Sequence, residues 1–256
     1  MTTRAARLFL VANTLDLGVE GEPADLQHSL PLGTLEVASS VTHWVAENAK
    51  NARAFLKRVH AVVPLALPLQ ELQINEWPRP RKGSGLELTL ADMAPLLAPA
   101  RAGHNMALIS DTGLPAVADP GALLVAAAHE AGVPVVPTSG PSSLVLALAA
   151  SGFNGQSFAF VGYLPTEAQA RASRLRELEA HSRRTGQTQL MIETPYRNAA
   201  LLQALLETLS PSTRLSVSCG LTLPDGWTRS DPVSRWRARP VSMPDRLPAV
   251  FALLGA

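Results

Sequence analysis

Short apolar segments alternate with segments of helical spacing through the first half of the chain. The apolar segments read "LFLVA", "VTHWVAE", "NMALIS" and "VPVVPTS", and the segments between them include "NAKNARAFLKRV" and "PGALLVAAAHEAG". Strands that are apolar throughout are typical of parallel sheets whose two faces are both covered by helices. We therefore predict an α/β fold with a mostly parallel N-terminal sheet.

The second half keeps its strands but places less helix between the last of them. The strand-like segments there read "SFAFVGYL", "TQLMIET", "RLSVSCG" and "LPAVFALL". Strands joined without a helix pair as antiparallel neighbours, so we predict a mixed C-terminal sheet. A chain of 256 residues can form one large domain or two small ones. The composition becomes small and apolar near Pro115, so we expect the domains to be residues 1–114 and 115–256.

Charge and cysteine content exclude several classes of protein. The chain has 22 basic and 21 acidic residues, so no overall field attracts a nucleic acid and any such binding needs a local patch. The single Cys219 excludes an internal disulfide and a cysteine-pair zinc site, and we predict no metal. The apolar segments are shorter than the roughly 18 residues that cross a bilayer, and we expect a cytoplasmic protein with no membrane partner.

Common catalytic and nucleotide-binding motifs are absent from the sequence. It contains no G-x-G-x-x-G, no G-x-x-x-x-G-K-[ST] and no H-E-x-x-H. The stretch "GPSSL" approaches G-x-S-x-G, but Leu144 stands at the second glycine, which argues against a serine hydrolase.

Two predicted strands end in loops of Gly, Pro and Ser. In "SDTGLP", Gly113 lets the backbone approach a ligand at the carboxyl end of a parallel strand. In "TSGPSSL", Ser142 or Ser143 can cap the following helix, or face a ligand together with the helix amides. An ordinary strand-to-helix turn explains "ADPG", and we assign Asp119 as its N-cap and Pro120 as the first helical residue.

Four segments, in order and spacing, carry a family resemblance. "ALISDTGLPAVADPG", "VVPTSGPSSLVLALAASGF", "FAFVGYLP" and "LMIETPYRN" resemble the motifs of tetrapyrrole methylase family proteins. Within the family they look most like the branch of ribosomal RNA small subunit methyltransferase I, with "SDAG-x-P-x-x-x-DPG", "PGPSA", "GF-x-P" and "ESPHR". "AENAKNARAFL" is more weakly similar to the "AEDTR" segment of that branch. The branch continues into a small C-terminal domain beyond the equivalent of "LPAVFALLGA", and we expect that domain to be lacking.

The resemblance implies two α/β/α domains with S-adenosylmethionine in the cleft between them, held by backbone and small side chains. Because the sulfonium carries its own activation, methyl transfer needs mainly a well-placed acceptor. The implied cofactor contacts are Leu15, Gly113, Leu114, Pro115, Val117, Ser142, Ser143, Ile192, Leu221, Pro248 and Ala249. For Leu114 and Ile192, a place in the core is an equal alternative.

Polar residues near the same loops are candidates for the acceptor side. A carboxylate can orient an acceptor hydroxyl or take its proton, and the catalytic candidates are Glu47, Asp111 and Glu193. The candidates for substrate binding are Asn13, Asn48, Lys50, Arg53, Tyr196 and Arg197. A solvated helix face is the alternative for Lys50 and Arg53, and a helix start is the alternative for Tyr196 and Arg197.

Basic groups offer a possible patch for phosphates. Arg79, Arg81 and Lys82 lie beside Trp77 in the Pro-rich segment 64–85, which we expect to be irregular. A further set lies on a polar helix: Arg171, Arg174, Arg176, Arg183 and Arg184. An ordinary basic loop and a solvated helix face are the alternatives.

The sequence thus predicts an S-adenosylmethionine-dependent methyltransferase. The resemblance favours the ribose 2'-hydroxyl of ribosomal RNA as acceptor, with a small tetrapyrrole-like or other metabolite as the alternative. The altered first loop "ANTLDLGVEGEPADL" and the "AENAK" segment leave open a cofactor-binding regulatory protein without transfer activity. The resemblance also leads us to expect a homodimer.

Overall fold

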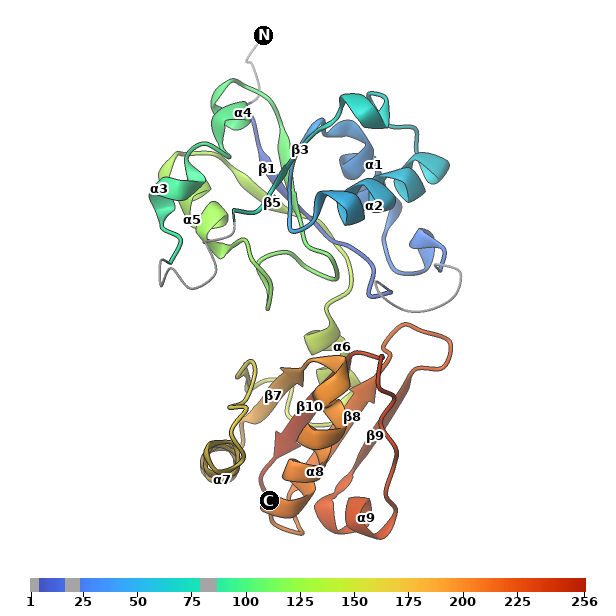
Figure 1. Cartoon of the computed structure of the whole chain (residues 1–256), viewed down its shortest axis with the longest axis vertical. Coiled ribbons are helices and arrows are strands. Elements are labelled where there is room, and N and C mark those ends of the chain that lie inside the picture. Colours follow the sequence, from blue (N-terminus) through green and yellow to red (C-terminus); the bar gives the residue numbers. More distant parts are fainter. Residues whose placement is uncertain (1–4, 17–23, 79–86) are drawn as a thin grey trace. The chain divides into compact units, whose positions relative to one another are not determined.

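The computed structural model describes residues 5–16, 24–78 and 87–256 (Figure 1). These divide into two compact units, one formed by residues 5–16, 24–78 and 87–141 and the other by residues 142–256. The expected boundary after Leu114 therefore falls inside the first unit. The division lies after Pro141 because the strand Val135–Pro137 (β5) pairs with the strand Leu8–Val11 (β1) of the first sheet.

The first unit contains a five-stranded sheet in the order β3-β2-β4-β1-β5. Every strand pair in it is parallel, which confirms the predicted parallel sheet. The other strands are β2 (His43–Ala46), β3 (Gln73–Glu76) and β4 (Met106–Ile109). The segment 64–85 is therefore not irregular throughout, contrary to our expectation, because β3 within it pairs with β2. All four residues of β4 are buried, as expected for a strand covered on both faces.

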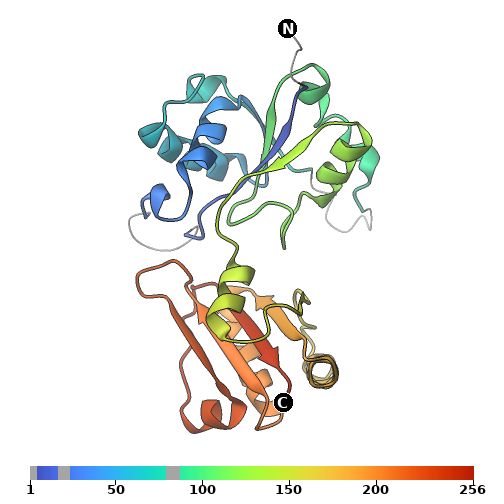
Figure 2. The same cartoon turned by 180° about the vertical axis from the view of Figure 1, so that it is seen from behind.

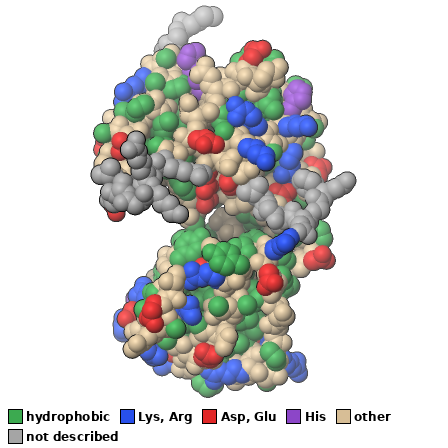
Figure 3. All heavy atoms as spheres, viewed as in Figure 1, with side chains coloured by type: hydrophobic (Ala, Val, Ile, Leu, Met, Phe, Trp, Pro, Cys, Tyr) green, Lys and Arg blue, Asp and Glu red, His purple; other side chains and the backbone are tan. Residues whose placement is uncertain are grey.

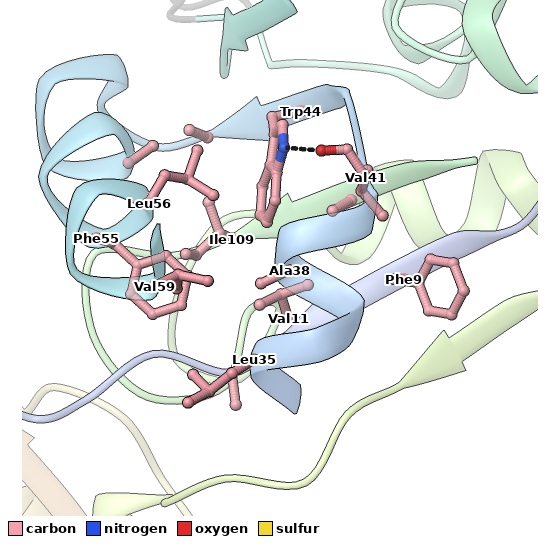
Figure 4. Close-up of a cluster of buried hydrophobic side chains, with 14 of the residues drawn as sticks. Phe9, Val11, Leu35, Ala38, Val41, Trp44, Phe55, Leu56, Val59 and Ile109 are labelled. Carbon is pink, nitrogen blue, oxygen red and sulfur yellow. Dashed lines mark hydrogen bonds between the residues drawn. The ribbon is translucent and has the colours of Figure 1, made fainter. Parts of the chain in front are cut away.

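Helices cover both faces of this sheet. The helices are α1 (Leu32–Ser40), α2 (Ala49–Val62), α3 (Leu90–Met93), α4 (Ala98–Arg101) and α5 (Ala122–Glu130), and the short 3₁₀ turns are η1 (Leu26–His28) and η2 (Leu69–Glu71). Successive strand residues alternate between two clusters, as the pleat requires: Trp44 packs with α1 and α2, and Val45 packs with α3, α4 and α5. Figure 4 shows the first cluster, in which Trp44 Nε1 donates a 3.0 Å hydrogen bond to the carbonyl of Val41.

The second unit contains a five-stranded mixed sheet in the order β6-β7-β10-β8-β9. The strands are β6 (Phe158–Phe160), β7 (Thr188–Glu193), β8 (Arg214–Cys219), β9 (Trp227–Pro232) and β10 (Ala249–Leu254). Only the β6–β7 pair is parallel among these, which confirms the predicted mixed sheet.

Helices also cover both faces of the second sheet. They are α6 (Ser143–Ser151), α7 (Ala168–Thr185), α8 (Asn198–Thr208) and α9 (Val233–Ala238), with a 3₁₀ turn η3 (Pro195–Arg197) before α8. Phe251 packs against α7, α8 and α9, whereas its neighbour Val250 packs against α6 on the opposite face. Figure 2 shows α6 from that side. Within the described ranges, no helix combines the length and apolar character needed to cross a bilayer.

Candidate functional site

The loops after β1 and β4 meet at the point where the strand order reverses. The chain leaves β1 for β2 on one side and leaves β4 for β5 on the other, and open α/β sheets bind ligands at such a point. The amide of Asn13 donates to the carbonyl of Gly113 at 2.8 Å, and the amide of Gly113 donates to the carbonyl of Thr14 at 3.2 Å. These reciprocal bonds hold the two loops side by side.

The side chain of Asn13 strengthens this connection. It is 7% exposed, and its Nδ2 donates to the carbonyls of Ser110 and Asp111 at 3.1 and 2.9 Å. Its Oδ1 accepts from the amide of Thr14 at 2.8 Å. The Asn13 side chain therefore connects the loop after β1 to the loop after β4. Its suggested contact with substrate stays a prediction.

Close backbone contact around Gly113 brings several predicted cofactor residues together. Gly113 has φ +66°, and a Cβ there would lie 3.3 Å from Leu15 Cδ2 and 3.6 Å from the carbonyl oxygen of Pro141. The loops after β1, β4 and β5 thus converge on this glycine. A side chain at this position would be strained and crowded.

The segment after Gly113 is strained in a way that is typical of functional loops. Ala116 and Ala118 have φ values of 66° and 63°, a region that costs a non-glycine residue about 1–2 kcal/mol. Between them, Val117 exposes 42% of its surface. Pro115 is buried, and Leu114 packs against the α1–α2 cluster, as the core alternative predicts. A ligand contact at Val117 is compatible with this exposure and stays a prediction.

Asp119 is not the helix cap that we expected, and this prediction was wrong. Helix α5 begins at Ala122, and Gly121 with φ +139° is its N-cap, so Pro120 is not the first helical residue either. Burial and the neighbouring carboxylate of Glu47 raise the pKa of Asp119 to about 6; the Ser110 hydroxyl opposes this rise, and Asp111 adds to it. In the folded chain Asp119 is thus influenced by the charges of Glu47 and Asp111, which follow β2 and β4.

Glu47 and Asn48 follow β2 beside the same loops. The amide of Glu47 donates to the carbonyl of Ile109 at 3.3 Å, and a carboxylate oxygen of Glu47 accepts from the amide of Asp111 at 3.4 Å. Asn48 is the N-cap of α2, and its side chain accepts from the amides of Lys50 and Asn51. The structure thus brings the catalytic candidates Glu47 and Asp111 together and gives Asn48 a structural role.

Lys50 and Arg53 are exposed on α2. In the space-filling view, Lys and Arg side chains gather over this helix (Figure 3), which also carries Lys57 and Arg58. This arrangement agrees with the solvated-face alternative and equally offers positive charge to a substrate.

The second group of predicted cofactor residues lies at one end of the second sheet. Ala249 pairs with both Glu193 of β7 and Cys219 of β8, so the ends of three strands meet there. The amide of Gly220 donates to the carbonyl of Pro248 at 2.9 Å.

Helix α6 begins against the same end of the sheet. Ile192 and Leu221 pack in the cluster that contains Leu144 of its first turn. Ser142 is the N-cap of α6, but its side chain makes no capping hydrogen bond. The hydroxyls of Ser142 and Ser143 are thus placed beside the strand ends without serving as side-chain caps among the described residues.

Glu193 lies in an ion pair within this second group. Its carboxylate is 3.0 Å from Arg197, and its side chain is 4% exposed. It also accepts from the amide of Thr194 at 2.9 Å. Tyr196 is 74% exposed on the 3₁₀ turn, where it is available to a partner.

The structure describes only some of the basic residues that could bind phosphates. Arg79, Arg81 and Lys82 lie outside the described residues. Trp77 packs against the α3–α5 cluster, so its ring contributes to the core of the first unit. On α7, Arg174 pairs with Glu177 at 3.1 Å, and Arg183 donates to the carbonyl of Ala256.

The predicted site residues therefore form two groups, one in each unit, and their joint contact with one cofactor stays a prediction. Within the described ranges, no cluster of three His, Cys, Asp or Glu side chains could hold a metal ion. The fold defines a two-unit α/β protein whose first sheet brings the loops after β1 and β4 together at the carboxyl ends of its parallel strands.

More particularly, the chain belongs to the tetrapyrrole (corrin/porphyrin) methylase family, whose model matches residues 29–231. This finding confirms the resemblance drawn from the four motifs. Members of this family take their methyl group from S-adenosylmethionine, in agreement with the predicted cofactor.

The chain is also similar in sequence to curated proteins that share one name. The chain is 39% identical over 120 residues to "Ribosomal RNA small subunit methyltransferase I" of Vibrio cholerae, an alignment covering 47% of this chain and 40% of the relative. It is 44% identical over 115 residues to the protein of that name from Xylella fastidiosa, covering 45% of this chain and 40% of the relative. The matched region thus spans less than half the length of these relatives.

Solved structures share the fold. Uroporphyrin-III-C-methyltransferase from Thermus thermophilus matches with a TM-score of 0.51 and 21% identity, covering 98% of this chain and 93% of that one. The methyltransferase CobJ matches with a TM-score of 0.57 and 16% identity, covering 98% of this chain and 95% of that one. These likenesses confirm the two-sheet α/β architecture.

Proposed function

We propose that this protein is an S-adenosylmethionine-dependent methyltransferase that acts on the ribose 2'-hydroxyl of ribosomal RNA. The observation that carries the proposal is the family match over residues 29–231, which includes both groups of site residues except Asn13, Leu15, Pro248 and Ala249. The names of the curated relatives support an RNA acceptor.

The loops of the first unit fit an uncharged, backbone-lined binding surface for the adenosyl group. Gly113 has no Cβ, which would lie 3.3 Å from Leu15 Cδ2, and Val117 in the strained segment presents an exposed apolar side chain. When bound, S-adenosylmethionine supplies an activated methyl group on a sulfonium. The residues of this chain then have to position the acceptor oxygen and receive its proton, and positioning alone can supply much of the rate.

The second unit would supply the remaining contacts. The hydroxyls of Ser142 and Ser143, the apolar side chains of Ile192 and Leu221, and the start of β10 lie at one end of its sheet. Placing both units around one cofactor is part of the proposal, as is a homodimeric, cytoplasmic protein.

Transfer of labelled methyl groups tests the function directly. Small ribosomal subunits from cells that lack the protein are incubated with it and labelled S-adenosylmethionine, and the RNA is digested to nucleosides. We expect label in one 2'-O-methylated nucleoside. No label in RNA, together with label in an added tetrapyrrole, would overturn the RNA acceptor but not the enzyme class.

A matched pair of glycine variants tests the cofactor site. Gly113→Ala and Gly132→Ala replace glycines with φ of +66° and +68°, but only Gly113 lies against Leu15 and Pro141. We expect both variants to lose stability through backbone strain, and Gly113→Ala to lose more because its Cβ is also crowded by Leu15. Only Gly113→Ala should weaken binding of S-adenosylhomocysteine in calorimetry, by about tenfold or more, equivalent to roughly 1.4 kcal/mol. Equal binding by the two variants would contradict this placement of the cofactor.

Two alternatives remain testable in the same system. A tetrapyrrole acceptor is suggested by the family description. Binding to RNA should weaken steeply with salt, whereas binding to a small metabolite should not. A cofactor-binding regulator would bind S-adenosylhomocysteine but transfer no methyl group to any acceptor in a cell extract.

A further inference from the structure

Helix α2 concentrates positive charge in a chain whose total charge is almost balanced. Its 14 residues include two lysines, two arginines and one histidine, and no acidic residue. The whole chain has 22 basic and 21 acidic residues, so this excess is a local feature. A local excess of one sign creates a field that attracts an oppositely charged partner to that surface.

Three of these cations lie in line on the solvent face of the helix. Lys50, Arg53 and Lys57 are exposed. At 3.6 residues per turn they fall within a sector roughly 60° wide and span about 10 Å along the helix axis. The opposite side packs into the first core cluster through Ala52, Phe55, Leu56 and Val59. This packing fixes which way the three cations face, and together they form the α2 stripe.

The charges of the α2 stripe are available to a partner. Among the described residues, no ion pair involves any of the three. Arg53 Nη1 makes one long contact, at 3.5 Å, with the carbonyl of Ala49 in its own helix. The elements that contact α2 carry carboxylates at Glu36, Glu71 and Glu76, and Glu76 accepts the amide of Ala49 at 2.9 Å.

Contacts at both ends of α2 connect it to the loops of the candidate site. Arg58 Nη2 donates to the carboxylate of Asp16 at 2.9 Å and to the carbonyl of Ala24 at 2.7 Å, which joins the helix to the loop after β1. The helix begins just after Glu47, whose amide donates to the carbonyl of Ile109 at the end of β4. The α2 stripe therefore starts at the carboxyl edge of the first sheet.

The arginines of α7 are less available. This helix also carries two glutamates, Glu177 and Glu179. Protein groups contact four of its five arginines: Arg171, Arg174, Arg183 and Arg184. Of the two basic helices, α2 thus offers more uncommitted charge.

We propose that the α2 stripe binds the sugar–phosphate backbone of the RNA strand that carries the acceptor ribose. This inference rests on the proposed function, because it names the surface that holds the RNA substrate. Lys and Arg donate charge-assisted hydrogen bonds to phosphate oxygens, and such contacts fix the register of a nucleic acid without reading its sequence. The stripe holds the strand beside the loops after β1 and β4 and takes no part in the chemistry.

The test removes the three charges together. Lys50→Gln, Arg53→Gln and Lys57→Gln in one chain keep good helix formers at exposed positions. Binding to transcribed small-subunit ribosomal RNA is measured with S-adenosylhomocysteine present, from about 50 to 300 mM salt. We expect the slope of log affinity against log salt to fall by about two to three, and the affinity at about 0.1 M salt to fall about 10²-fold.

Methyl transfer gives a second readout. Because the stripe contacts the backbone of the RNA and not the reacting atoms, the KM for RNA should rise while the rate at saturating RNA stays at the wild-type value. Loss of that saturated rate with an unchanged salt slope would overturn the inference, since it would place these residues in the chemical step.

Two further variants control for the change in net charge and for the other basic helix. The control replaces three exposed arginines outside α2 and α7 by glutamine: Arg101, Arg235 and Arg239. We expect it to keep the wild-type salt slope. The second variant replaces three exposed arginines of α7 by glutamine: Arg174, Arg176 and Arg184. If either of these lowers the slope as much as the α2 variant does, the effect is not specific to the stripe and the inference is overturned.

The outcomes separate this inference from the function on which it rests. If wild type methylates RNA and the α2 variant binds RNA with the wild-type affinity and slope, the inference is overturned and the function stands. If wild type binds RNA through the stripe but methylates no acceptor, the inference stands and the function is overturned. If the α2 variant loses binding only to vesicles of phosphatidylserine and phosphatidylcholine, the surface recognises lipid and the inference is overturned.

Discussion

Replacing Asp119 by asparagine should stabilise the first unit, and the gain should depend on pH. In the folded chain the pKa of Asp119 is raised to about 6 from an ordinary 3.8, chiefly by burial and by Glu47. The folded state therefore binds this proton more tightly than the unfolded state, so its stabilising effect is complete below pH 3.8 and is lost as pH rises through 6. Asparagine resembles the protonated acid and keeps that stability at every pH.

The magnitude follows from the difference between the two pKa values. A difference of about two corresponds to about 3 kcal/mol at pH 8, where the folded carboxylate is fully charged. Because the group is partly exposed, solvent screening reduces this to roughly 1–2 kcal/mol. At pH 4 the wild-type carboxyl is protonated in the folded state, and the advantage of asparagine should shrink to a few tenths of a kcal/mol.

Amide hydrogen exchange can measure this effect in the first unit alone. Exchange in β1 and β4 reports the opening of the unit that contains Asp119, whereas a single melting temperature would mix the two units. Comparing variant and wild type at one pH cancels the intrinsic exchange rates. We expect about 5–30-fold slower exchange for Asp119→Asn at pH 8 and nearly equal exchange at pH 4, with β8 and β10 of the second unit unchanged.

Two results would refute this reasoning. Equal destabilisation by Asp119→Asn at pH 4 and pH 8 would mean that its carboxylate makes favourable contacts in the folded state. Glu47→Gln removes the neighbouring charge with the largest effect on Asp119. If the pH dependence of amide exchange were the same in Glu47→Gln as in wild type, the two carboxylates would not interact.

Three further substitutions test the contacts that shape the site. Asn13→Ala removes the side-chain ties between the loops after β1 and β4, and should lower the free energy of unfolding of the first unit by about 1–3 kcal/mol in denaturant titration. Gly140→Ala would overlap the Cβ of Ala12 and should destabilise the same unit by about 1–3 kcal/mol, seen as faster exchange in β1 and β5. Arg197→Ala leaves the carboxylate of Glu193 buried without its cation and should cost the second unit about 1–3 kcal/mol, most of which Glu193→Gln in the same chain restores.

Each of these predictions has a result that contradicts it. Unchanged stability of Asn13→Ala would show that the backbone bonds alone hold the two loops. Wild-type exchange in Gly140→Ala would show that β1 yields easily at this contact. Failure of Glu193→Gln to restore stability would show that Arg197 acts through packing and not through its charge.

The fold class could be predicted because its signals are local. Apolar strands followed by helical segments predict a parallel sheet wherever they alternate, and the first unit follows that pattern from β1 to β5. The four motifs were sufficient to indicate the family because each lies within a short continuous stretch. The glycine at 113 also carries its meaning locally, since a positive φ is a property of that residue.

The division into units was decided by long-range pairing. Composition changes near Pro115, but the strand that follows returns to pair with β1, more than a hundred residues earlier. Asn13 illustrates the same limit: its sequence neighbours suggest a ligand contact, whereas its partners lie after β4.

At Asp119 the role predicted from the sequence differs from the one found in the tertiary structure. "ADPG" before an apolar helix is a good local signal for an N-cap, because capping depends only on the next few residues. The carboxylate that changes the role of Asp119 is Glu47, which follows a different strand and is brought near by the pairing of β2 with β4. The sequence by itself thus determined most of the strands and helices and the need for glycine at position 113. Only the tertiary structure decided which charges meet, because electrostatic interaction depends on distance in space and not on separation along the chain.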